Sequence, residues 1–269
     1  MSSENQEAPI LLGKPENNPY KVAGILLGQR IAWDLKRASW ISRKRLRALK
    51  DKHKGKKAVI LCNGPSLTKT NFDSLKGVFT IAMNKINLLF DKTDFRPSCI
   101  VSQNPLVIEQ NLAFFNATEI PLFIAHFEAD KIKLRKNVAF IHEVRYNRKF
   151  SQDCSMSVYM GPTVTFAAMQ LAFHMGFQEV ALVGCDHNFA TKGPANKEVT
   201  SGDADPNHFD PNYFAGGVKW HLPDLAESEG VYLIARNTFE AAGRKIVNAT
   251  IGGKLEIFER QSLEHFLQG

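Results

Sequence analysis

The chain has 269 residues, 44% of them hydrophobic, which is enough to bury the core of one α/β domain. Its net charge of +7 is unevenly distributed, because residues 21–57 hold thirteen lysines and arginines against two acids and the remainder is net negative. This distribution argues against nucleic acid as a partner of the remainder.

The composition also predicts the compartment. Four cysteines are scattered along the chain without a CxxC pair, which favours buried thiols in a reducing environment and argues against a zinc site. No apolar run is long enough to cross a membrane, and the start of the chain lacks the pattern of a secretory signal peptide. We therefore expect a cytoplasmic protein.

The beginning of the chain divides into two parts. Residues 1–20 are polar, contain three prolines and predict a disordered tail. Residues 21–55 predict a basic amphipathic helical arm with a break near Gly28.

On one continuous helical wheel, this arm has two apolar sides. Trp33 and Trp40 lie on the side that lysines and arginines flank, whereas Ile31 and Leu35 lie on the other side. We expect the second side to pack on the domain and the tryptophan side to bind an anionic membrane surface, as interfacial helices do. A helix packed on both sides, or a homo-oligomer contact, is the alternative. On this interpretation, a chain that starts near Gly55 stays folded.

Short apolar segments alternate with helical patterns from residue 56 to residue 269. This alternation indicates a Rossmann-like, doubly wound α/β domain with a mostly parallel sheet. The predicted strands cover residues 58–61, 78–83, 98–103, 121–126, 138–142, 179–184 and 245–248, and the predicted helices cover residues 105–115, 163–176 and 225–243.

One long segment interrupts this alternation. Residues 187–221 are polar and rich in glycine, proline and asparagine, yet they also contain aromatic residues and three histidines. A long loop inside a compact domain is usually functional or disordered, and the aromatic residues argue against disorder. We interpret the segment as a lid inserted in the domain, with Gly202, Gly216 and Gly217 as hinges.

Polar residues follow four of the predicted strands. They are Asn63, Gly64 and Ser66 after the first strand, and Asn84, Asn104 and Asp186 after three others. Because the carboxyl ends of parallel strands share one edge of a sheet, we expect these residues to converge on a nucleotide-binding crevice. A turn or cap is the alternative role for each asparagine taken alone.

A second anion site is predicted at the start of a helix. Thr163 and Thr165 combine hydroxyl groups with the free N–H groups of a helix N-terminus. In the lid, His208 and His221 are the candidates for proton transfer, because the pKa of histidine lies near neutrality. The chain contains no GxxxxGK[ST], HExxH, GxSxG or GxGxxG motif, which removes the commonest ATPase, metalloprotease, hydrolase and dinucleotide-binding assignments.

The turn CNGPSL at residues 62–67, combined with the segment 163–189 that ends in LVGCDHNF, resembles two related groups of proteins. One group is the bacterial single-domain sialyltransferases that modify surface lipooligosaccharide. The other is the family named for archaeal 6-hydroxymethylpterin diphosphokinase, which includes motility-associated glycosyltransferases. The resemblance covers roughly residues 56–260, and NATIGGKLE at residues 248–256 is most similar to the bacterial branch of the second group.

This resemblance implies roles for the candidate residues. It implies that Asn63 and Ser66 contact the nucleotide phosphate and that Asn84 and Asn104 contact the phosphate or the transferred group. It also implies that Thr163 and Thr165 hold the phosphate–ribose end and that Asp186 contacts the ribose. Tyr213 would donate a proton to the leaving phosphate, and His221, with His208 in reserve, would be the general base.

The first functional hypothesis is an inverting, metal-independent glycosyltransferase. It would use a nucleotide-activated sugar, with CMP as a candidate nucleotide, to modify a bacterial surface glycan, and it would need no cofactor. The alternative is a diphosphokinase that transfers pyrophosphate from ATP to a pterin-like hydroxymethyl compound. That reaction uses Mg²⁺, for which Asp186, Asp203 and Asp205 would be the ligands. A third hypothesis is a binding module that keeps only the nucleotide crevice.

Overall fold

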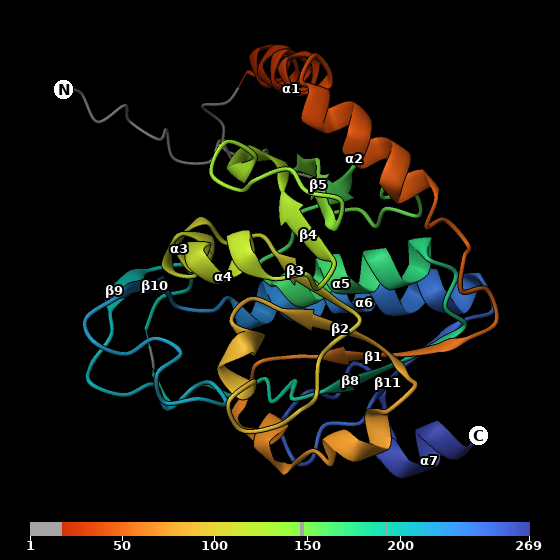
Figure 1. Ribbon diagram of the computed structural model, residues 1–269, viewed down its shortest axis with the longest axis vertical. Helices are drawn as coiled ribbons and strands as arrows, with labels where there is room; N and C mark the ends of the chain where they lie inside the picture. The colour runs from red at the N-terminus through yellow and green to blue at the C-terminus, as the bar shows by residue number, and fades with distance from the viewer. Residues whose placement is uncertain (1–17, 146–147, 192) are drawn as a thin grey trace.

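The computed structural model describes residues 18–145, 148–191 and 193–269. At its centre lies one sheet of eight strands in the order β12-β11-β8-β1-β2-β3-β4-β5, and every neighbouring pair is parallel (Figure 1). Helices cover both faces of the sheet, so the predicted Rossmann-like, doubly wound α/β architecture is confirmed.

The strands of this sheet are short, and all except the outermost, two-residue strand are almost fully buried. They are β1 (Lys57–Leu61), β2 (Phe79–Met83), β3 (Cys99–Ser102), β4 (Leu122–Ala125), β5 (Val138–Ile141), β8 (Glu179–Val183), β11 (Lys245–Asn248) and β12 (Glu259–Arg260). Seven of the eight coincide with apolar runs, as expected for strands that are covered on both faces. Strand β12 was not predicted, because it consists of two exposed charged residues.

The helices form one layer on each face. One face packs on α5 (Val164–His174) and α6 (Leu225–Ala241), and the other on α3 (Pro105–Gln110), α4 (Leu112–Ala117), α7 (Leu263–Gln268) and the 3₁₀ turns η1 (Pro65–Lys69), η2 (Phe72–Leu75) and η3 (Ile86–Leu89). Alternate residues of one strand point toward the two helical layers. Ala58 and Ile60 of β1 face α5, whereas Val59 and Leu61 face the opposite layer.

The chain changes direction across the sheet between β1 and β8. It builds β1 to β5 in sequence on one side and then returns to build β8, β11 and β12 on the other. Strands β1 and β8 are therefore direct neighbours, with Leu61 opposite Val183. The carboxyl ends on the two sides of such a switch point border the crevice in which open α/β sheets bind ligands.

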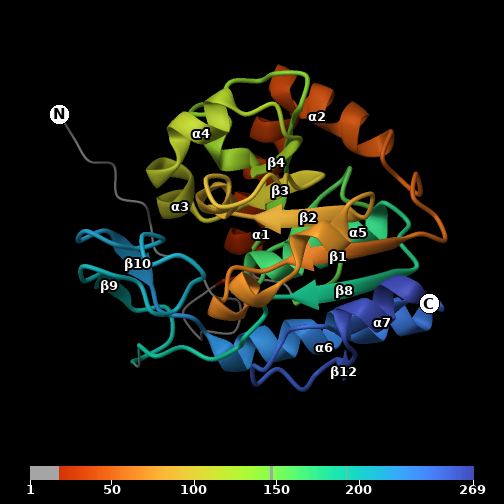
Figure 2. The ribbon, with the colours of Figure 1, turned by 60° about the horizontal axis from the view of Figure 1, so that its bottom comes forward.

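The segment 187–221 lies at this carboxyl edge. It contains a two-stranded antiparallel ribbon of β9 (Glu198–Thr200) and β10 (Lys219–His221). In Figure 2 the arrowheads of β1, β2 and β8 point toward the side on which β9 and β10 lie. A separate parallel pair, β6 (Glu143–Val144) and β7 (Val158–Tyr159), and the turn η4 (His126–Glu128) follow the strands near β5.

The arm forms two helices, α1 (Pro19–Asp34) and α2 (Arg37–Arg47), with the break at Lys36 and not at Gly28. The backbone of Lys36 is extended, so the chain turns there and α2 starts in a new orientation. The tail prediction for residues 1–20 falls almost entirely outside the described residues, although α1 already begins at Pro19. Among the described residues, no helix combines the length and the apolarity that crossing a bilayer requires.

The helical wheel assigned the wrong side of α1 to the domain. Trp33 is 4% exposed and packs edge-on against His126, with 5.2 Å between ring centroids. Ile31 and Leu35 are exposed instead, while Trp40 is exposed as predicted. The break at Lys36 explains the error, because α1 docks by the side of Trp33 and α2 docks by the opposite side of the assumed single helix.

Candidate functional site

Asn63, at the end of β1, is a docking point for the lid. Its Nδ2 donates a hydrogen bond to the Tyr213 hydroxyl at 3.1 Å, and its carbonyl oxygen accepts one from the Phe209 N–H at 2.9 Å. The side-chain Oδ1 is buried and has no hydrogen-bond partner among the described residues. A buried acceptor without a donor is costly, and a ligand hydroxyl or N–H group would satisfy it.

Asp186, at the end of β8, is tied to the turn that follows β1. One carboxylate oxygen, Oδ2, accepts hydrogen bonds from the Ser66 hydroxyl at 2.7 Å and from the Ser66 N–H at 3.2 Å. A Cβ atom on Gly64 would lie 2.0 Å from that oxygen and 2.6 Å from the carbonyl oxygen of Gly184. The glycine is thus required by the close approach of the two strand ends, and this contact joins Gly64, Ser66 and Asp186 in one unit.

Asn84 follows β2 in a left-handed conformation, with a φ of 54°, that asparagine tolerates. Its Oδ1 accepts a hydrogen bond from the Ser102 hydroxyl at 3.0 Å, which links the ends of β2 and β3. Asn104 has a different role, because its Oδ1 caps α3 by accepting from the N–H groups of Leu106 and Val107. For Asn104 the geometry matches the cap that was the alternative to ligand binding.

Lys85 is a site residue that the sequence analysis missed. It is 7% exposed, and its Nζ donates to the Tyr213 carbonyl oxygen at 2.6 Å and to Gln110 Oε1 at 2.7 Å. Burial lowers the pKa of Lys85 to about 8, and the nearby carboxylate of Asp205 opposes this shift. The available signal was a lysine directly after Asn84, at a strand end and between apolar residues.

The start of α5 approaches the strand ends from the other face of the sheet. Thr163 caps this helix, because its hydroxyl oxygen accepts from the Thr165 N–H at 3.2 Å. The Thr165 hydroxyl lies 3.8 Å from Cys62 Sγ and 3.7 Å from Met83 Sδ, at the ends of β1 and β2. The predicted helix N-terminus therefore reaches the same edge as Asn63 and Asp186.

His208 and Tyr213 form a stacked pair in the lid, with centroids 4.1 Å apart and an interplanar angle of 3°. The carboxylate of Asp205, almost fully buried, holds His208 Nδ1 at 2.7 Å. This contact orients the ring and leaves Nε2 as the nitrogen that can take a proton. Burial raises the pKa of Tyr213, so its hydroxyl stays a hydrogen-bond donor.

His221 does not join this group in the structure. It lies on β10 opposite Glu198 and is exposed, whereas the preceding residue, Trp220, is buried. Successive side chains of a strand point to opposite sides, so the burial of Trp220 turns His221 outward.

A second buried polar group lies at the ends of β3 and β5. Gln103 Nε2 donates to Glu143 Oε1 at 2.6 Å, and Glu143 Oε2 is buried without a partner among the described residues. Burial raises the pKa of Glu143 to about 8 and lowers the pKa of His126 to about 3. Glu143 was not predicted as a candidate, because it lies outside the predicted elements and its partner, Gln103, is distant in sequence.

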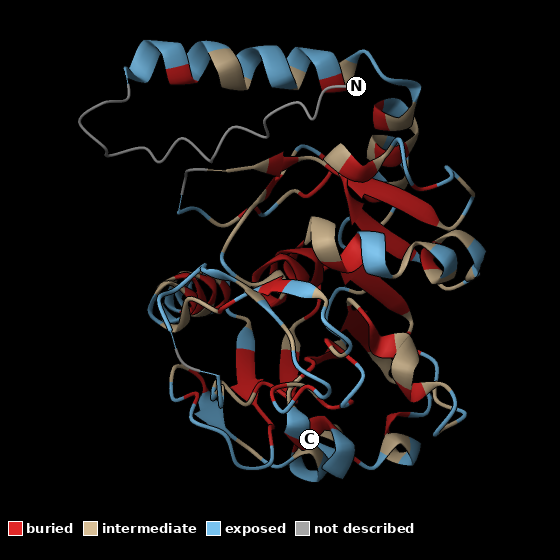
Figure 3. Ribbon diagram, turned by 90° about the vertical axis from the view of Figure 1, so that its left-hand side faces the viewer, coloured by how far each residue is buried: buried red, intermediate tan, exposed pale blue. Residues whose placement is uncertain are grey.

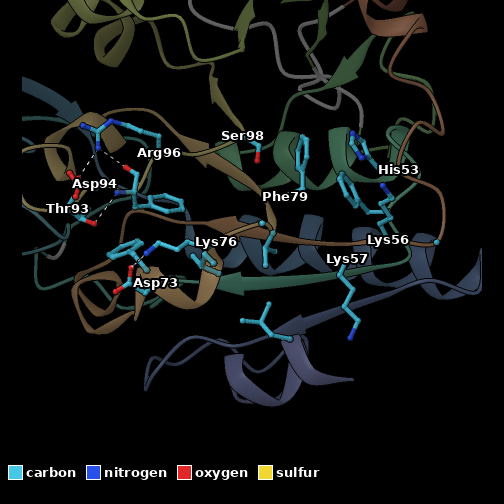
Figure 4. A pocket seen from close by; sticks show the side chains of 18 residues that line it. His53, Lys56, Lys57, Asp73, Lys76, Phe79, Thr93, Asp94, Arg96 and Ser98 are labelled. Atoms are coloured by element: carbon cyan, nitrogen blue, oxygen red, sulfur yellow. Dashed lines mark hydrogen bonds and ion pairs between the residues drawn. The ribbon is translucent and has the colours of Figure 1, made fainter.

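A large cavity lies elsewhere, at the amino ends of β1 to β3. It has a volume of about 1090 Å³ and is lined by basic and aromatic residues, His53 among them (Figure 4). Several of its charged groups are already paired, since Lys57 Nζ donates to the Phe266 carbonyl oxygen at 2.7 Å and Lys76 lies 2.8 Å from Asp73. None of the predicted site residues lines it, and we assign the site by its chemistry to the opposite edge.

The three carboxylates considered for Mg²⁺ do not form a metal site in this structure. Asp186 is held by Ser66, Asp205 by His208, and Asp203 is exposed. Across the described ranges, no three or more histidine, cysteine or acidic side chains are grouped so that they could hold a metal ion.

The chain is similar to a known protein family. A family model described as 6-hydroxymethylpterin diphosphokinase MptE-like matches residues 35–192, more than half of the chain. The matched region includes Asn63, Asn84, Thr165 and Asp186, and it ends before His208 and Tyr213 of the lid. No curated protein matches the chain.

Proposed function

The chain belongs to the 6-hydroxymethylpterin diphosphokinase MptE-like family, which has a transferase-type function, and we propose that it is a glycosyltransferase. It takes a sugar from a nucleotide-activated donor, with CMP as the first candidate nucleotide, and transfers it to a bacterial surface glycan. The observation that carries this proposal is the group formed by Asp205, His208, Tyr213 and Asn63 at the carboxyl edge of β1.

The donor binds where β1, β8 and α5 meet. The N-terminus of α5 provides positive potential for the phosphate, whereas the N–H groups of Gly64 and Ser66 are already bound to the Gly184 carbonyl oxygen and to Asp186. The unpaired Oδ1 of Asn63 accepts from a ribose or base donor. Lys85 adds a positive charge below the lid and, as an ammonium group, strengthens the attraction for an anionic donor.

The reaction is a direct displacement with inversion. The acceptor hydroxyl attacks the anomeric carbon of the sugar, its proton passes to His208 Nε2, and the bond to the nucleotide phosphate breaks. Asp205 keeps the His208 ring in position and stabilises the imidazolium. The Tyr213 hydroxyl donates a hydrogen bond to the departing phosphate once the donor displaces it from Asn63.

The second candidate is a diphosphokinase, which the name of the matched family favours. Such an enzyme moves pyrophosphate from ATP to a pterin-like hydroxymethyl compound, and it uses Mg²⁺ to neutralise the triphosphate. Both oxygens of Asp205 are engaged, with the Asn207 N–H and with His208, and Oδ2 of Asp186 is engaged with Ser66, so a metal ion would compete with the contacts of Asp205. The glycosyltransferase reaction keeps the contacts of Asp186 and Asp205 and opens the one between Asn63 and Tyr213.

Ligand-induced stabilisation tests the two candidates. The melting temperature of the full chain is measured with CMP, CDP, UDP, GDP and ATP, each with and without Mg²⁺. A ligand at a hundred times its dissociation constant stabilises the folded state by about 2.7 kcal/mol. We expect a cytidine nucleotide to stabilise the protein without Mg²⁺. If only ATP together with Mg²⁺ stabilises the protein, the diphosphokinase replaces the glycosyltransferase as the proposed function. If no nucleotide stabilises it, both candidate functions are wrong.

Turnover with the donor so identified tests the catalytic assignment. We expect His208→Ala and Asp205→Asn to lower kcat by about 10²- to 10⁴-fold, with nucleotide affinity nearly unchanged, because both act on proton transfer. His221→Ala is the matched comparison. If His221→Ala loses turnover while His208→Ala keeps it, His221 is the base and the assignment to His208 is wrong.

A further inference from the structure

Exposed apolar side chains are concentrated on the arm. Five of the nine large apolar side chains that are exposed among the described residues lie between residues 20 and 40. They are Tyr20, Leu27, Ile31, Leu35 and Trp40. Figure 3 shows α1, at the top, as a largely exposed helix. Scattered exposed apolar residues are ordinary, but a continuous group of this kind marks an interaction surface.

The first four of these residues share one side of α1. The spacing of Tyr20, Leu27 and Ile31 by seven and four residues places them on one stripe, and Leu35 extends it to the corner. Val22 and Trp33 lie on the opposite side and are buried. Helix α1 therefore has two apolar sides, and only one of them packs on the domain.

Trp40 continues the stripe onto α2. Its Nε1 donates to the Asp34 carbonyl oxygen at 2.7 Å, which holds the indole beside the corner at Leu35. Next to it is a hollow of about 560 Å³, lined by Trp40, Ile41, Arg43, Lys44 and Arg47. This hollow combines apolar walls with three positive charges, a chemistry that suits an anionic amphiphile.

The charged residues of the arm are nearly all positive. Lys21, Arg37, Lys44 and Arg47 are exposed and form no ion pair with any residue that the structure describes. Asp34, which lies at the end of α1, is neutralised by Arg30 at 2.7 Å and Arg43 at 3.4 Å. Arg37, Trp40, Lys44 and Arg47 recur at helical spacing and so share the exposed side of α2.

We propose that this surface, defined by Tyr20, Leu27, Ile31, Leu35 and Trp40 and called the arm face below, binds an anionic lipid bilayer. Helix α1 lies flat in the interfacial region with the apolar stripe toward the acyl chains, and the unpaired cations meet the lipid phosphates. The Trp40 ring lies at the headgroup level, where tryptophan is favoured.

A second copy of the chain fits the arm face less well than a bilayer does. In a two-fold dimer the same patch lies on both sides of the contact, so both sides would carry the positive charges of Arg37, Lys44 and Arg47. Like charges brought together oppose association, whereas an anionic bilayer attracts them. The bilayer site needs no nucleotide, so the proposal stands apart from the transferase assignment.

Vesicle sedimentation of the full chain tests the proposal. We expect the protein to bind phosphatidylcholine vesicles that contain phosphatidylglycerol and not vesicles of phosphatidylcholine alone, and to dissociate at high salt. The triple variant Arg37→Gln/Lys44→Gln/Arg47→Gln should bind about a hundredfold more weakly, because each basic residue near the surface contributes about 1 kcal/mol. Its charge-matched control is Lys69→Gln/Lys133→Gln/Lys254→Gln, which should bind like the unchanged chain.

The apolar stripe has its own pair of variants. Leu27→Gln/Ile31→Gln should lower vesicle affinity by at least about tenfold, since two large side chains no longer enter the interface. Leu134→Gln/Leu233→Gln, which changes two exposed leucines outside the arm, should change nothing. Melting curves show that each variant is folded. The proposal is overturned if the full chain does not bind anionic vesicles at low salt, if Leu27→Gln/Ile31→Gln binds unchanged, or if that variant only converts a dimer to a monomer.

Discussion

Three buried titratable groups lie at the ends of β4 and β5. Burial raises the pKa of Glu143 to about 8 and lowers the pKa values of His126 and His142 to about 3 and about 4. All three are therefore neutral near pH 7 in the folded state. Ionisation of the Glu143 carboxyl group in alkali therefore destabilises the fold, and protonation of the two imidazoles in acid does the same.

We predict that Glu143→Gln flattens the dependence of stability on pH. Between the ordinary pKa of 4.5 and the folded value of about 8, the folded state keeps a proton that the unfolded state has released. The free energy of unfolding therefore falls as pH rises through this window. Glutamine removes that fall and should stabilise the protein by an amount of the order of a few kcal/mol near pH 8.

Urea unfolding at several pH values between about 5 and 8 measures this effect. Glu109→Gln, a change at an exposed carboxylate, is the control and should parallel the unchanged chain. Parallel curves for Glu143→Gln as well would show that Glu143 is not held neutral.

At the residue scale, the sequence predicts the position of those candidate residues that directly follow a buried strand. Asn63 and Asp186 follow neighbouring strands, and apolar runs reveal those strands directly. Lys85 and Glu143 were missed because their importance depends on partners that are distant in sequence, Tyr213 and Gln103. Spacing along the chain carries no signal for such contacts.

Helix α2 covers the edge of the central sheet. The Ser42 hydroxyl oxygen accepts a hydrogen bond from the Phe140 N–H of β5 at 2.9 Å. Arg45 Nη1 donates to the carbonyl oxygens of Arg135 and Val138 at the start of the same strand. An uncovered edge strand invites pairing with other chains, and α2 prevents this by occupying the backbone groups of β5.

We predict that Ser42→Ala destabilises the domain by about 1–3 kcal/mol, because it leaves the buried Phe140 N–H without an acceptor. The helix propensity of alanine offsets part of this loss. Urea unfolding gives the change. Ser74→Ala, which removes an exposed hydroxyl that donates to the Asn71 carbonyl oxygen, should change stability by less than about 0.5 kcal/mol. Equal effects of the two changes would mean that Ser42 does not hold the edge.

Helices and strands that are buried on both faces were predictable, because such burial requires runs of apolar residues. The central strands and α5, whose side chains are almost all buried, were found within a few residues. The ribbon of β9 and β10 and the strands β6, β7 and β12 are short or exposed, so no apolar period marks them. The prediction of which side of α1 packs on the domain was wrong, because the extended backbone of Lys36 ends the single helix that the helical wheel assumed.

The arm is part of the domain and not an appendage. Leu46 of α2 is 1% exposed within the core on the α5 side, and Trp33 of α1 packs in the core on the other side. The expectation that a chain starting near Gly55 stays folded is inconsistent with these contacts, because removal of both helices uncovers the edge of β5 and two parts of the core.

We predict that a chain lacking residues 1–55 aggregates and loses cooperative unfolding. A chain that starts at Lys36 keeps α2 and is the matched comparison. It should remain monomeric and unfold cooperatively, with a lower melting temperature because the packing of Trp33 on His126 and Phe140 is lost. Size-exclusion chromatography and thermal unfolding distinguish the two. Cooperative unfolding of the shorter chain would show that the edge of β5 needs no cover.

The docked side of α1 contacts both buried histidines. Trp33 packs on His126, and Arg30 Nη1 lies 3.5 Å from His142 Nδ1 while donating to the Ser157 hydroxyl at 3.1 Å. A bilayer on the arm face acts on the same helix from its other side. By thermodynamic reciprocity, any change that the bilayer makes to the proton affinity of these imidazoles equals the change that their protonation makes to bilayer affinity. Helix α1 thus lies between the two buried imidazoles and the proposed lipid-binding face.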